Sequence, residues 1–471
     1  MNISKNSMEQ NKTHMNEKNL TLDELNLFRC SEELKNTKIY SNLYDVLCRV
    51  ESKRVTSMEE IYGLSDTALS ILVNKKQEIK ERIVNEWEAS GYGYDPNQKA
   101  KCDFCHRMNN KYFFHIKNVI NNTVLTVGST CIGKFLKIKR YDEQKSLMEQ
   151  DRNQRSFMMN NAELLGYSQT IHQYFDAEKY FLSLPMLPPY DIYSGLKENL
   201  MNMKSICLNY KGTSVEFDVE WEKYQNLKSQ ADTFIKDNIN NPLICKKEEV
   251  DWIIANDKFE LLEEISKNNG VYTANTLGLV YSEEFTKNNI SKIAQRNKSH
   301  SIKFGECNPV SIVALFNMNG YYNQISFQIP LRTLMKTIGC NCILNDDYEY
   351  STEDILPMSI IMNTQINIET IIQYIARILI GTDYAFLYDN TRDEILIYRK
   401  NDSAVKYINA YNFLQSYSKI ILQSSEKVKI NMQRIINSIK SNQWISVEKQ
   451  KEQEIYENIV SLYNEHEKNC G

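Results

Sequence analysis

Hydrophobic residues recur at helical spacing over much of this chain, and the pattern predicts a mainly α-helical protein. In residues 66–88 the apolar positions mostly follow one another at intervals of three or four. The preceding residues 1–20 are polar and predict a flexible arm. We therefore expect residues 21–95 to form a helical region, which the Gly- and Tyr-containing segment 91–96 closes as a loop.

The second half of the chain combines helical and alternating patterns. Residues 141–185 predict an exposed helix followed by a proline-containing linker, and residues 190–300 predict a mostly helical region in which 215–221 alternates as a short strand. Residues 301–400 predict an α+β region, and residues 401–471 predict C-terminal helices. The strands expected in the α+β region are 311–316, 324–330, 384–388 and 394–399.

A separate alternating pattern lies between these regions. Residues 112–119 and 123–127 alternate as two strands about an Asn121-Asn122 turn. A tight turn at that point pairs residues whose numbers sum to about 243, which places His115 opposite Gly128 and Tyr112 opposite Cys131.

Cysteines flank this predicted hairpin on both sides. Cys102 and Cys105 form a C-x-x-C pair, and Cys131 follows the second strand. The chain contains 11 cysteines and begins without an apolar leader, so we expect a cytoplasmic protein whose cysteines do not form a disulfide framework. A C-x-x-C pair brings two thiolates to one tetrahedral ion, and zinc prefers such ligands. The sequence therefore predicts a zinc-binding module at residues 100–140.

The fourth zinc ligand is less clearly marked than the three cysteines. His106 directly follows Cys105, and neighbouring side chains rarely point at the same metal. His115 lies near Cys131 in the expected hairpin, so we favour it as the ligand. A distant cysteine or a water molecule remains an alternative.

The order of residues around Cys131 resembles a known short module. Val127-Gly128-Ser129, Cys131-Ile132 and Lys134-Phe135 match the pattern C-x-x-C … V-G-S-x-C-I-x-K-F, which recurs in uncharacterised proteins of phages and low-GC bacteria. The resemblance covers about residues 100–136 and implies a zinc module in a phage or mobile-element setting. It carries no established enzymatic activity.

We expect the zinc to be structural. A catalytic zinc keeps one open position and needs a nearby general base, but no Glu occurs between Lys101 and Arg140. A short hairpin unit has too little core to fold on apolar burial alone, so a metal would stabilise it. The competing interpretation is three free cysteines in a small core. Together these patterns predict a mainly α protein with an embedded β-hairpin zinc module and an α+β segment in the C-terminal half.

The charge distribution suggests a partner for the module. Residues 101–140 contain eight basic residues and a single acid, a net charge of +7, whereas the whole chain carries −4. Aromatic residues interleave with these cations, a combination typical of nucleic-acid contact. The expected contact residues are Lys134, Lys137, Lys139, Arg140, Lys117 and Arg107.

Two other functions remain possible from the sequence. The module could act as a platform for a protein partner, or the C-terminal half could hold the active site of a metal-dependent nuclease. Acidic groups occur at Asp346, Asp347 and Glu349, but their spacing matches no motif and solvated charges explain them. No apolar segment is long enough to predict a membrane span. The pattern leaves the oligomeric state open.

Overall fold

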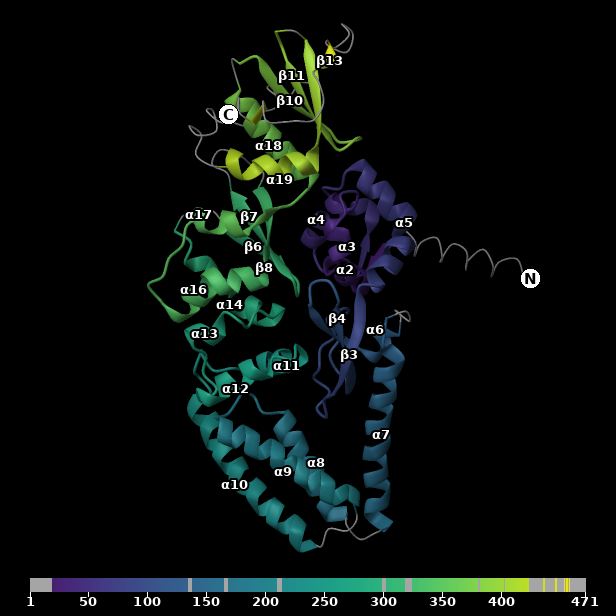
Figure 1. Ribbon diagram of the computed structural model, residues 1–471, viewed down its shortest axis with the longest axis vertical. Helices are drawn as coiled ribbons and strands as arrows, with labels where there is room; N and C mark the ends of the chain where they lie inside the picture. The colour runs from purple at the N-terminus through teal and green to yellow at the C-terminus, as the bar shows by residue number, and fades with distance from the viewer. Residues whose placement is uncertain are drawn as a thin grey trace, which may run out of the picture. The chain divides into compact units, whose positions relative to one another are not determined.

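The computed structural model shows a mixed α+β protein (Figure 1). It describes residues 19–133, 138–164, 168–209, 214–298, 302–317, 324–379, 382–401, 403–422, 435–436, 445–446, 453, 455 and 457. Of the described residues, 56% are helical and 20% lie in strands, which form small antiparallel sheets. The expectation of a mainly α protein was therefore wrong. Strand content was underestimated because several short strands lack clean alternation of apolar and polar residues.

The chain folds into two compact units. Unit 1 comprises Met1–Ile83, Ile290–Pro330 and Asp347–Gly471, and unit 2 comprises Val84–Asn289 and Leu331–Asp346. The expected arm at residues 1–20 lies outside the described residues except for its last two positions. Among the described residues, none of the helices combines the length and apolar character that crossing a bilayer requires.

Unit 1 begins with a group of short elements that pack around α4. Thr21 caps the first helix, and its exchange of hydrogen bonds with Glu24 completes the capping box that the sequence contains. The elements are β1 (Asn19–Thr21), α2 (Leu22–Arg29), α3 (Glu32–Asn36), α4 (Ser41–Arg49), β2 (Val55–Ser57), η1 (Met58–Glu60) and α5 (Asp66–Val84).

Two four-stranded antiparallel sheets complete unit 1. The first contains β6 (Ile302–Cys307), β7 (Ser311–Asn317), β8 (Gln324–Pro330) and β9 (Ile360–Ile361), and the second contains β10 (Tyr384–Asp389), β11 (Glu394–Arg399), β12 (Ala404–Asn409) and β13 (Ile445–Ser446). These bounds confirm the four strands expected between residues 311 and 399. The helices are α17 (Thr352–Ile355), η3 (Leu356–Met358), α18 (Gln365–Ile378) and α19 (Ala410–Ile421).

The helices α18 and α19 bury their apolar faces against these sheets. Ile371 and Ile375 of α18 and Phe413 of α19 are fully buried with the core residues of both sheets. The expected C-terminal helices begin later than predicted, because residues 404–409 extend the sheet as β12 and Asn409 then caps α19. Most of the chain after residue 422 lies outside the described residues.

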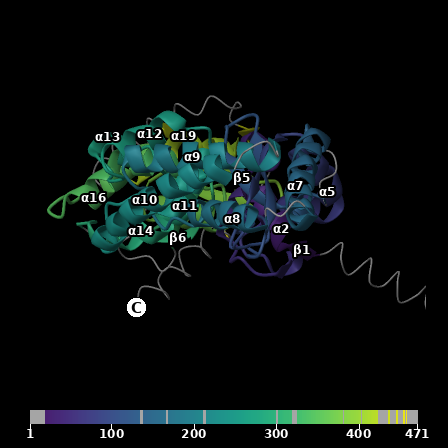
Figure 2. The ribbon, with the colours of Figure 1, turned by 90° about the horizontal axis from the view of Figure 1, so that it is seen from below.

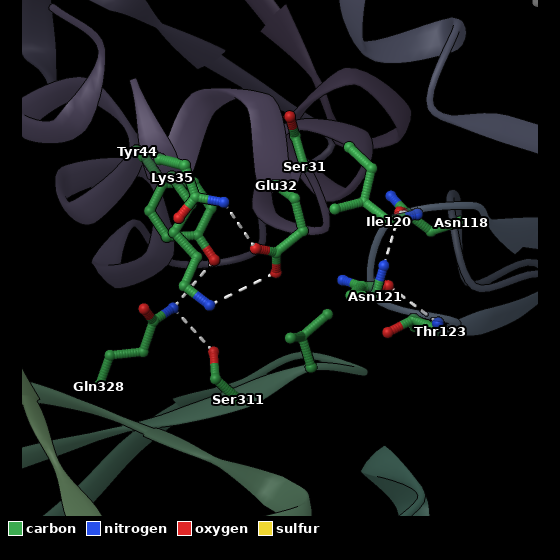
Figure 3. A network of polar contacts seen from close by, with 12 residues as sticks. Ser31, Glu32, Lys35, Tyr44, Asn118, Ile120, Asn121, Thr123, Ser311 and Gln328 are labelled. Atoms are coloured by element: carbon green, nitrogen blue, oxygen red, sulfur yellow. Dashed lines mark hydrogen bonds and ion pairs between the residues drawn. The ribbon is translucent and has the colours of Figure 1, made fainter. Parts of the chain in front are cut away.

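A buried polar contact ties α4 to the first sheet of unit 1. The Gln328 side-chain amide donates hydrogen bonds to the Tyr44 hydroxyl at 3.0 Å and to the Ser311 hydroxyl at 2.8 Å (Figure 3). All three side chains are buried, so each hydrogen bond replaces one that water would otherwise supply.

Unit 2 is mostly helical. Its helices are α7 (Tyr141–Leu164), α8 (Ser168–Leu182), α9 (Tyr190–Asn209), α10 (Ser214–Asn238), α11 (Lys247–Ala255), α12 (Phe259–Lys267), α13 (Ala274–Leu277), α15 (Leu331–Leu334), η2 (Met335–Gly339) and α16 (Cys340–Leu344), with α14 (Glu283–Gln295) leading into unit 1. The helices α8, α9 and α10 lie side by side (Figures 1 and 2) and share one apolar core.

The strand expected at residues 215–221 is the first part of helix α10. Phe217 and Tyr224, seven residues apart, are buried against α9, whereas Val215 and Val219 are 66% and 50% exposed. Within seven residues, a strand pattern and a helical pattern place hydrophobic residues at several of the same positions. The short pattern at residues 215–221 therefore predicted a strand where the structure has a helix.

A three-stranded antiparallel sheet in unit 2 carries the cysteine module. It contains β3 (Trp87–Tyr94), β4 (Tyr112–Asn118) and β5 (Val124–Gly128), with β4 in the centre. The expected loop at residues 91–96 was wrong, because most of this segment belongs to β3. Gly93 fits there because the Phe113 ring lies across it, 2.2 Å from the point where a Cβ atom would stand.

Candidate metal centre

The loop that precedes Cys102 is fixed by one carboxylate. Asp95 accepts hydrogen bonds from the backbone N–H groups of Asn97, Lys99 and Ala100 at 2.6–2.9 Å. An aspartate that binds its own following backbone stabilises a turn without regular secondary structure. The chain therefore leaves β3 in a defined direction and enters the C-x-x-C segment.

The C-x-x-C segment itself is a closed turn. The Cys102 N–H donates to the Arg107 carbonyl at 3.0 Å, and the His106 N–H donates to the Cys102 carbonyl at 2.7 Å. His106 has a φ of 55°, the left-handed conformation that reverses the chain directly after Cys105. This turn directs the thiols of Cys102 and Cys105 toward the same point.

The hairpin that brings Cys131 back differs in register from the sequence-based expectation. Phe113 pairs with Gly128 and His115 pairs with Thr126, so the pairing is shifted by two residues and His115 does not face Gly128. The turn is longer than an Asn121-Asn122 turn. The Asn118 side chain accepts hydrogen bonds from the N–H groups of Ile120 and Asn121 and so ends β4 one residue early (Figure 3).

Cys131 follows β5 on the short helix α6 (Ser129–Ile132). Gly128, the residue that joins β5 to α6, has the Asn110 amide oxygen 2.5 Å from the point where a Cβ atom would stand. A larger residue would therefore push the loop that follows the C-x-x-C turn away from α6. This close approach lets Cys131 meet the turn.

The three cysteines form a group that can hold a metal ion. The Sγ atoms of Cys102, Cys105 and Cys131 all lie within 4.8 Å of one another, and those of Cys105 and Cys131 are 3.3 Å apart. Cys102 and Cys131 are buried, whereas Cys105 is partly exposed. Within the described part of the chain, no second group of three or more His, Cys, Asp or Glu side chains converges in this way.

Hydrogen bonds to Cys102 favour its thiolate. The thiol of Cys131 and the backbone N–H groups of Gly128, Cys105 and Phe104 lower the pKa of Cys102 to about 5, against the opposing effect of burial. Metal binding requires the thiolate form. The fold therefore favours at Cys102 the thiolate that a metal ion binds.

Asp103, inside the C-x-x-C turn, fastens that turn to β5. Its carboxylate accepts a hydrogen bond from the Thr126 N–H at 2.6 Å, and its own N–H donates to the Thr126 carbonyl at 2.8 Å. Burial, with a smaller contribution from nearby Glu283, raises the pKa of Asp103 to about 8. Sequence reasoning missed this role, because only the strand register shows that Asp103 meets Thr126.

The structure does not bring His115 into the cysteine group. Its Nδ1 atom lies 3.4 Å from the Thr126 hydroxyl, and its ring packs edge-on against Phe113 at 5.4 Å between centroids. Burial lowers the pKa of His115 to about 4, which keeps the ring neutral. His106 also lies outside the group of converging ligand atoms.

The basic residues of the module differ in their surroundings. Arg107 and Lys139 are exposed and Lys117 is half-buried, whereas exposed Arg140 forms an ion pair with Glu143 at 3.0 Å. Lys101 pairs with Glu284 of α14 at 3.5 Å. The predicted contact residues Lys134 and Lys137 lie outside the described residues. Part of the positive charge counted in the sequence is therefore balanced by acids from outside residues 101–140.

Comparison of the chain with protein-family models, with curated proteins and with solved structures gave no match.

Proposed function

We propose that Cys102, Cys105 and Cys131 bind one Zn²⁺ ion that stabilises the surrounding module. The observation that supports this most strongly is the convergence of three thiols from two separate segments within 4.8 Å. Thiolates bound to a tetrahedral zinc at about 2.3 Å lie about 3.8 Å from one another, a spacing that this group can adopt. Three thiolates of one charge are unfavourable together unless a cation neutralises them.

A structural role fits the position of the group. The three-stranded sheet and the C-x-x-C turn are small, and a metal that joins them would add its binding free energy to the apolar core around Phe104, Phe114 and Val127. The fourth zinc position falls to a water molecule or to a ligand from outside the described residues, since no fourth His, Cys, Asp or Glu of the described chain joins the group.

Removal of a thiol tests the structural role. Cys131→Ser should lose the metal and raise the hydrogen-exchange rates of backbone amides in residues 100–132, while the amides of α9 and α10 stay protected. Cys207→Ser is the matched control, because Cys207 is also a buried free cysteine of unit 2 but lies far along the chain on α9. Faster exchange throughout unit 2 in the Cys131 variant, or unchanged exchange, would contradict a local structural centre.

We further propose that the module contacts nucleic acid through its exposed cations. This second proposal is supported by the +7 charge of residues 101–140 in a chain of net charge −4. Arg107 and Lys139 are exposed and have no acidic partner in the described part of the chain, so both are available to a phosphate backbone. Sequence-independent affinity for nucleic acid comes mainly from such contacts.

A salt titration tests this contact. Replacing Lys134, Lys137, Lys139 and Arg140 together by Gln should leave the metal content unchanged, weaken binding and flatten its salt dependence by up to about four units of slope. A control with four exposed lysines of unit 2 outside the module replaced by Gln should bind as the native chain does. The replaced lysines are Lys197, Lys223, Lys236 and Lys267. Equal slopes for the native chain and the module variant would remove this proposal and favour a protein partner.

A further inference from the structure

The second sheet of unit 1 carries apolar side chains on both of its faces. One face packs against α18 and α19, and Ile395 and Ile397 of β11 are fully buried there. The side chains that alternate with them along the strands point to the opposite face, which we call the outer face. The outer face consists of two cross-strand rows, Ala385, Tyr398 and Val405 in the first and Leu387, Leu396 and Tyr407 in the second. An apolar surface of this kind needs a cover, because removing it from water stabilises the fold.

One residue from the C-terminal part of the chain packs on the outer face. Ile455 is 4% exposed and is buried together with the first row, whose three side chains are 3–5% exposed. The side chains of the second row are only partly buried. Ile455 therefore begins a cover for this face, and the second row has room for more of it.

Three contacts trace the C-terminal part of the chain around this sheet. Ile435 and Ile436 are buried in the core that the sheet shares with α18 and α19, and β13 then pairs with β12 at the edge of the sheet. Ile455 follows on the outer face. Because α18 and α19 occupy the first face, the chain that leaves β13 after Ser446 passes around the edge to the outer face. Residues 447–452 can span about 20 Å when extended, which is more than the distance of about 10 Å between packed layers.

The residues around Ile455 have the pattern of a helix with one apolar side. Gln453, Ile455 and Glu457 are helical. The Gln453 amide donates a hydrogen bond to the Glu457 carboxylate at 3.0 Å, and both of these side chains are exposed whereas Ile455 is buried. Further along the sequence, Ile459 and Leu462 stand four and seven residues after Ile455. This spacing places the three apolar side chains on one side of a helix.

We infer that residues 453–463 form an amphipathic helix that docks on the outer face of the second sheet of the same chain. Such a helix is about 16 Å long, enough to cross β10, β11 and β12, which stand about 4.8 Å apart. With Ile455 on the first row, Ile459 and Leu462 cover the second row. The occupant is the chain's own segment, because Ile455 packs there and the connection from β13 is long enough. The inference does not rest on the metal centre.

Hydrogen exchange of the backbone amides of residues 453–463 in the full chain tests this inference. A helix of this length is marginal in water by itself, so docking should slow the exchange of these amides about tenfold or more relative to an unstructured chain. The protection should be the same in dilute and in concentrated protein, because docking within one chain does not depend on concentration. Protection that falls on dilution would assign the helix to the outer face of a second copy and overturn the inference.

The decisive variant is Ile459→Glu, which places a charge on the apolar side of the helix although glutamate favours helices more than isoleucine does. Loss of this apolar contact should make the amides of residues 453–463 exchange about tenfold faster or more. Ser461→Glu is the matched control, because it adds the same charge on the polar side of the helix and should change the rates less than about twofold. Unprotected amides in the native chain, equal effects of both variants, or no effect of Ile459→Glu would overturn the inference.

Discussion

The Sγ atoms of Cys105 and Cys131 lie 3.3 Å apart although 26 residues separate them in the sequence. The hairpin of β4 and β5 brings them together, and the hydrogen bonds of Asp103 with Thr126 hold the C-x-x-C turn against that hairpin. A metal ion at this point would link the two ends of the hairpin. Because the unfolded chain lacks the assembled site, the binding free energy of the metal would stabilise the folded module.

The Asp103 carboxylate should be important for the stability of the module. Asp103→Ala leaves the Thr126 N–H without its acceptor and should lower the free energy of unfolding of the module by about 1–3 kcal/mol. Hydrogen exchange of the β5 amides measures this loss. Asp103→Asn keeps an oxygen acceptor and should cost clearly less. If the two variants exchange at the same rate, the hydrogen bond to Thr126 does not fasten the turn.

Arg155 should stabilise the contact of the sheet with the helices of unit 2. Its guanidinium group stacks 3.8 Å from the centroid of the Tyr94 ring on β3 and pairs with Glu178 of α8 at 3.0 Å and with Asp151 of α7 at 2.8 Å. Lysine cannot reproduce this planar stacking and forked hydrogen bonding. Arg155→Lys should therefore lower the stability of unit 2 by about 2 kcal/mol.

Thermal unfolding measures this effect, and Arg152→Lys is its control. Arg152 lies on the same helix but is exposed, so its replacement should leave the unfolding temperature almost unchanged. An unfolding temperature that Arg155→Lys leaves unchanged would show that the positive charge, which lysine keeps, is all that Arg155 contributes.

Asp45 should make the stability of unit 1 depend on pH. The carboxylate accepts a hydrogen bond from the Asn363 N–H, and burial raises the pKa of Asp45 from 3.8 to about 7, although Asn363, Lys35 and Arg49 oppose the shift. The folded state therefore binds this proton more tightly than the unfolded state. The resulting stability is fully present below pH 3.8 and is lost as the pH rises through about 7.

Asp45→Asn should remove this dependence. The variant keeps an acceptor for the Asn363 N–H but has no proton to lose. Between pH 4 and pH 8 the native chain should therefore lose on the order of 3 kcal/mol of stability that the variant does not lose. Unfolding curves across that range provide the measurement. Asp383→Asn, at an exposed position of unit 1, should leave the pH profile of the native chain unchanged. An unaltered profile in the Asp45 variant would mean that Asp45 is ionised at no cost.

The sequence predicted the cysteine group because its signal is local. The C-x-x-C spacing of Cys102 and Cys105 restricts both thiols to one turn, and the alternating residues after Tyr112 predict a strand that must return before Cys131. The register could not be predicted in the same way. It depends on the Asn118 side chain, whose hydrogen bonds to Ile120 and Asn121 lengthen the turn and move His115 opposite Thr126.

The mixed fold was harder to predict because its strands depend on contacts between distant residues. Gly91 and Gly93 predict a loop when read alone, but in β3 they pair with His115 and Phe113 of β4, and Gly93 makes room for the Phe113 ring. No spacing rule along the chain connects such positions.

Elemental analysis of the freshly purified native chain tests whether the three cysteines hold zinc. We predict one zinc ion per chain, and a content close to zero in Cys102→Ser and Cys131→Ser, while Cys207→Ser retains the native value. Zinc-free native protein purified without chelators, or a zinc content that Cys131→Ser leaves unchanged, would contradict zinc binding by these cysteines.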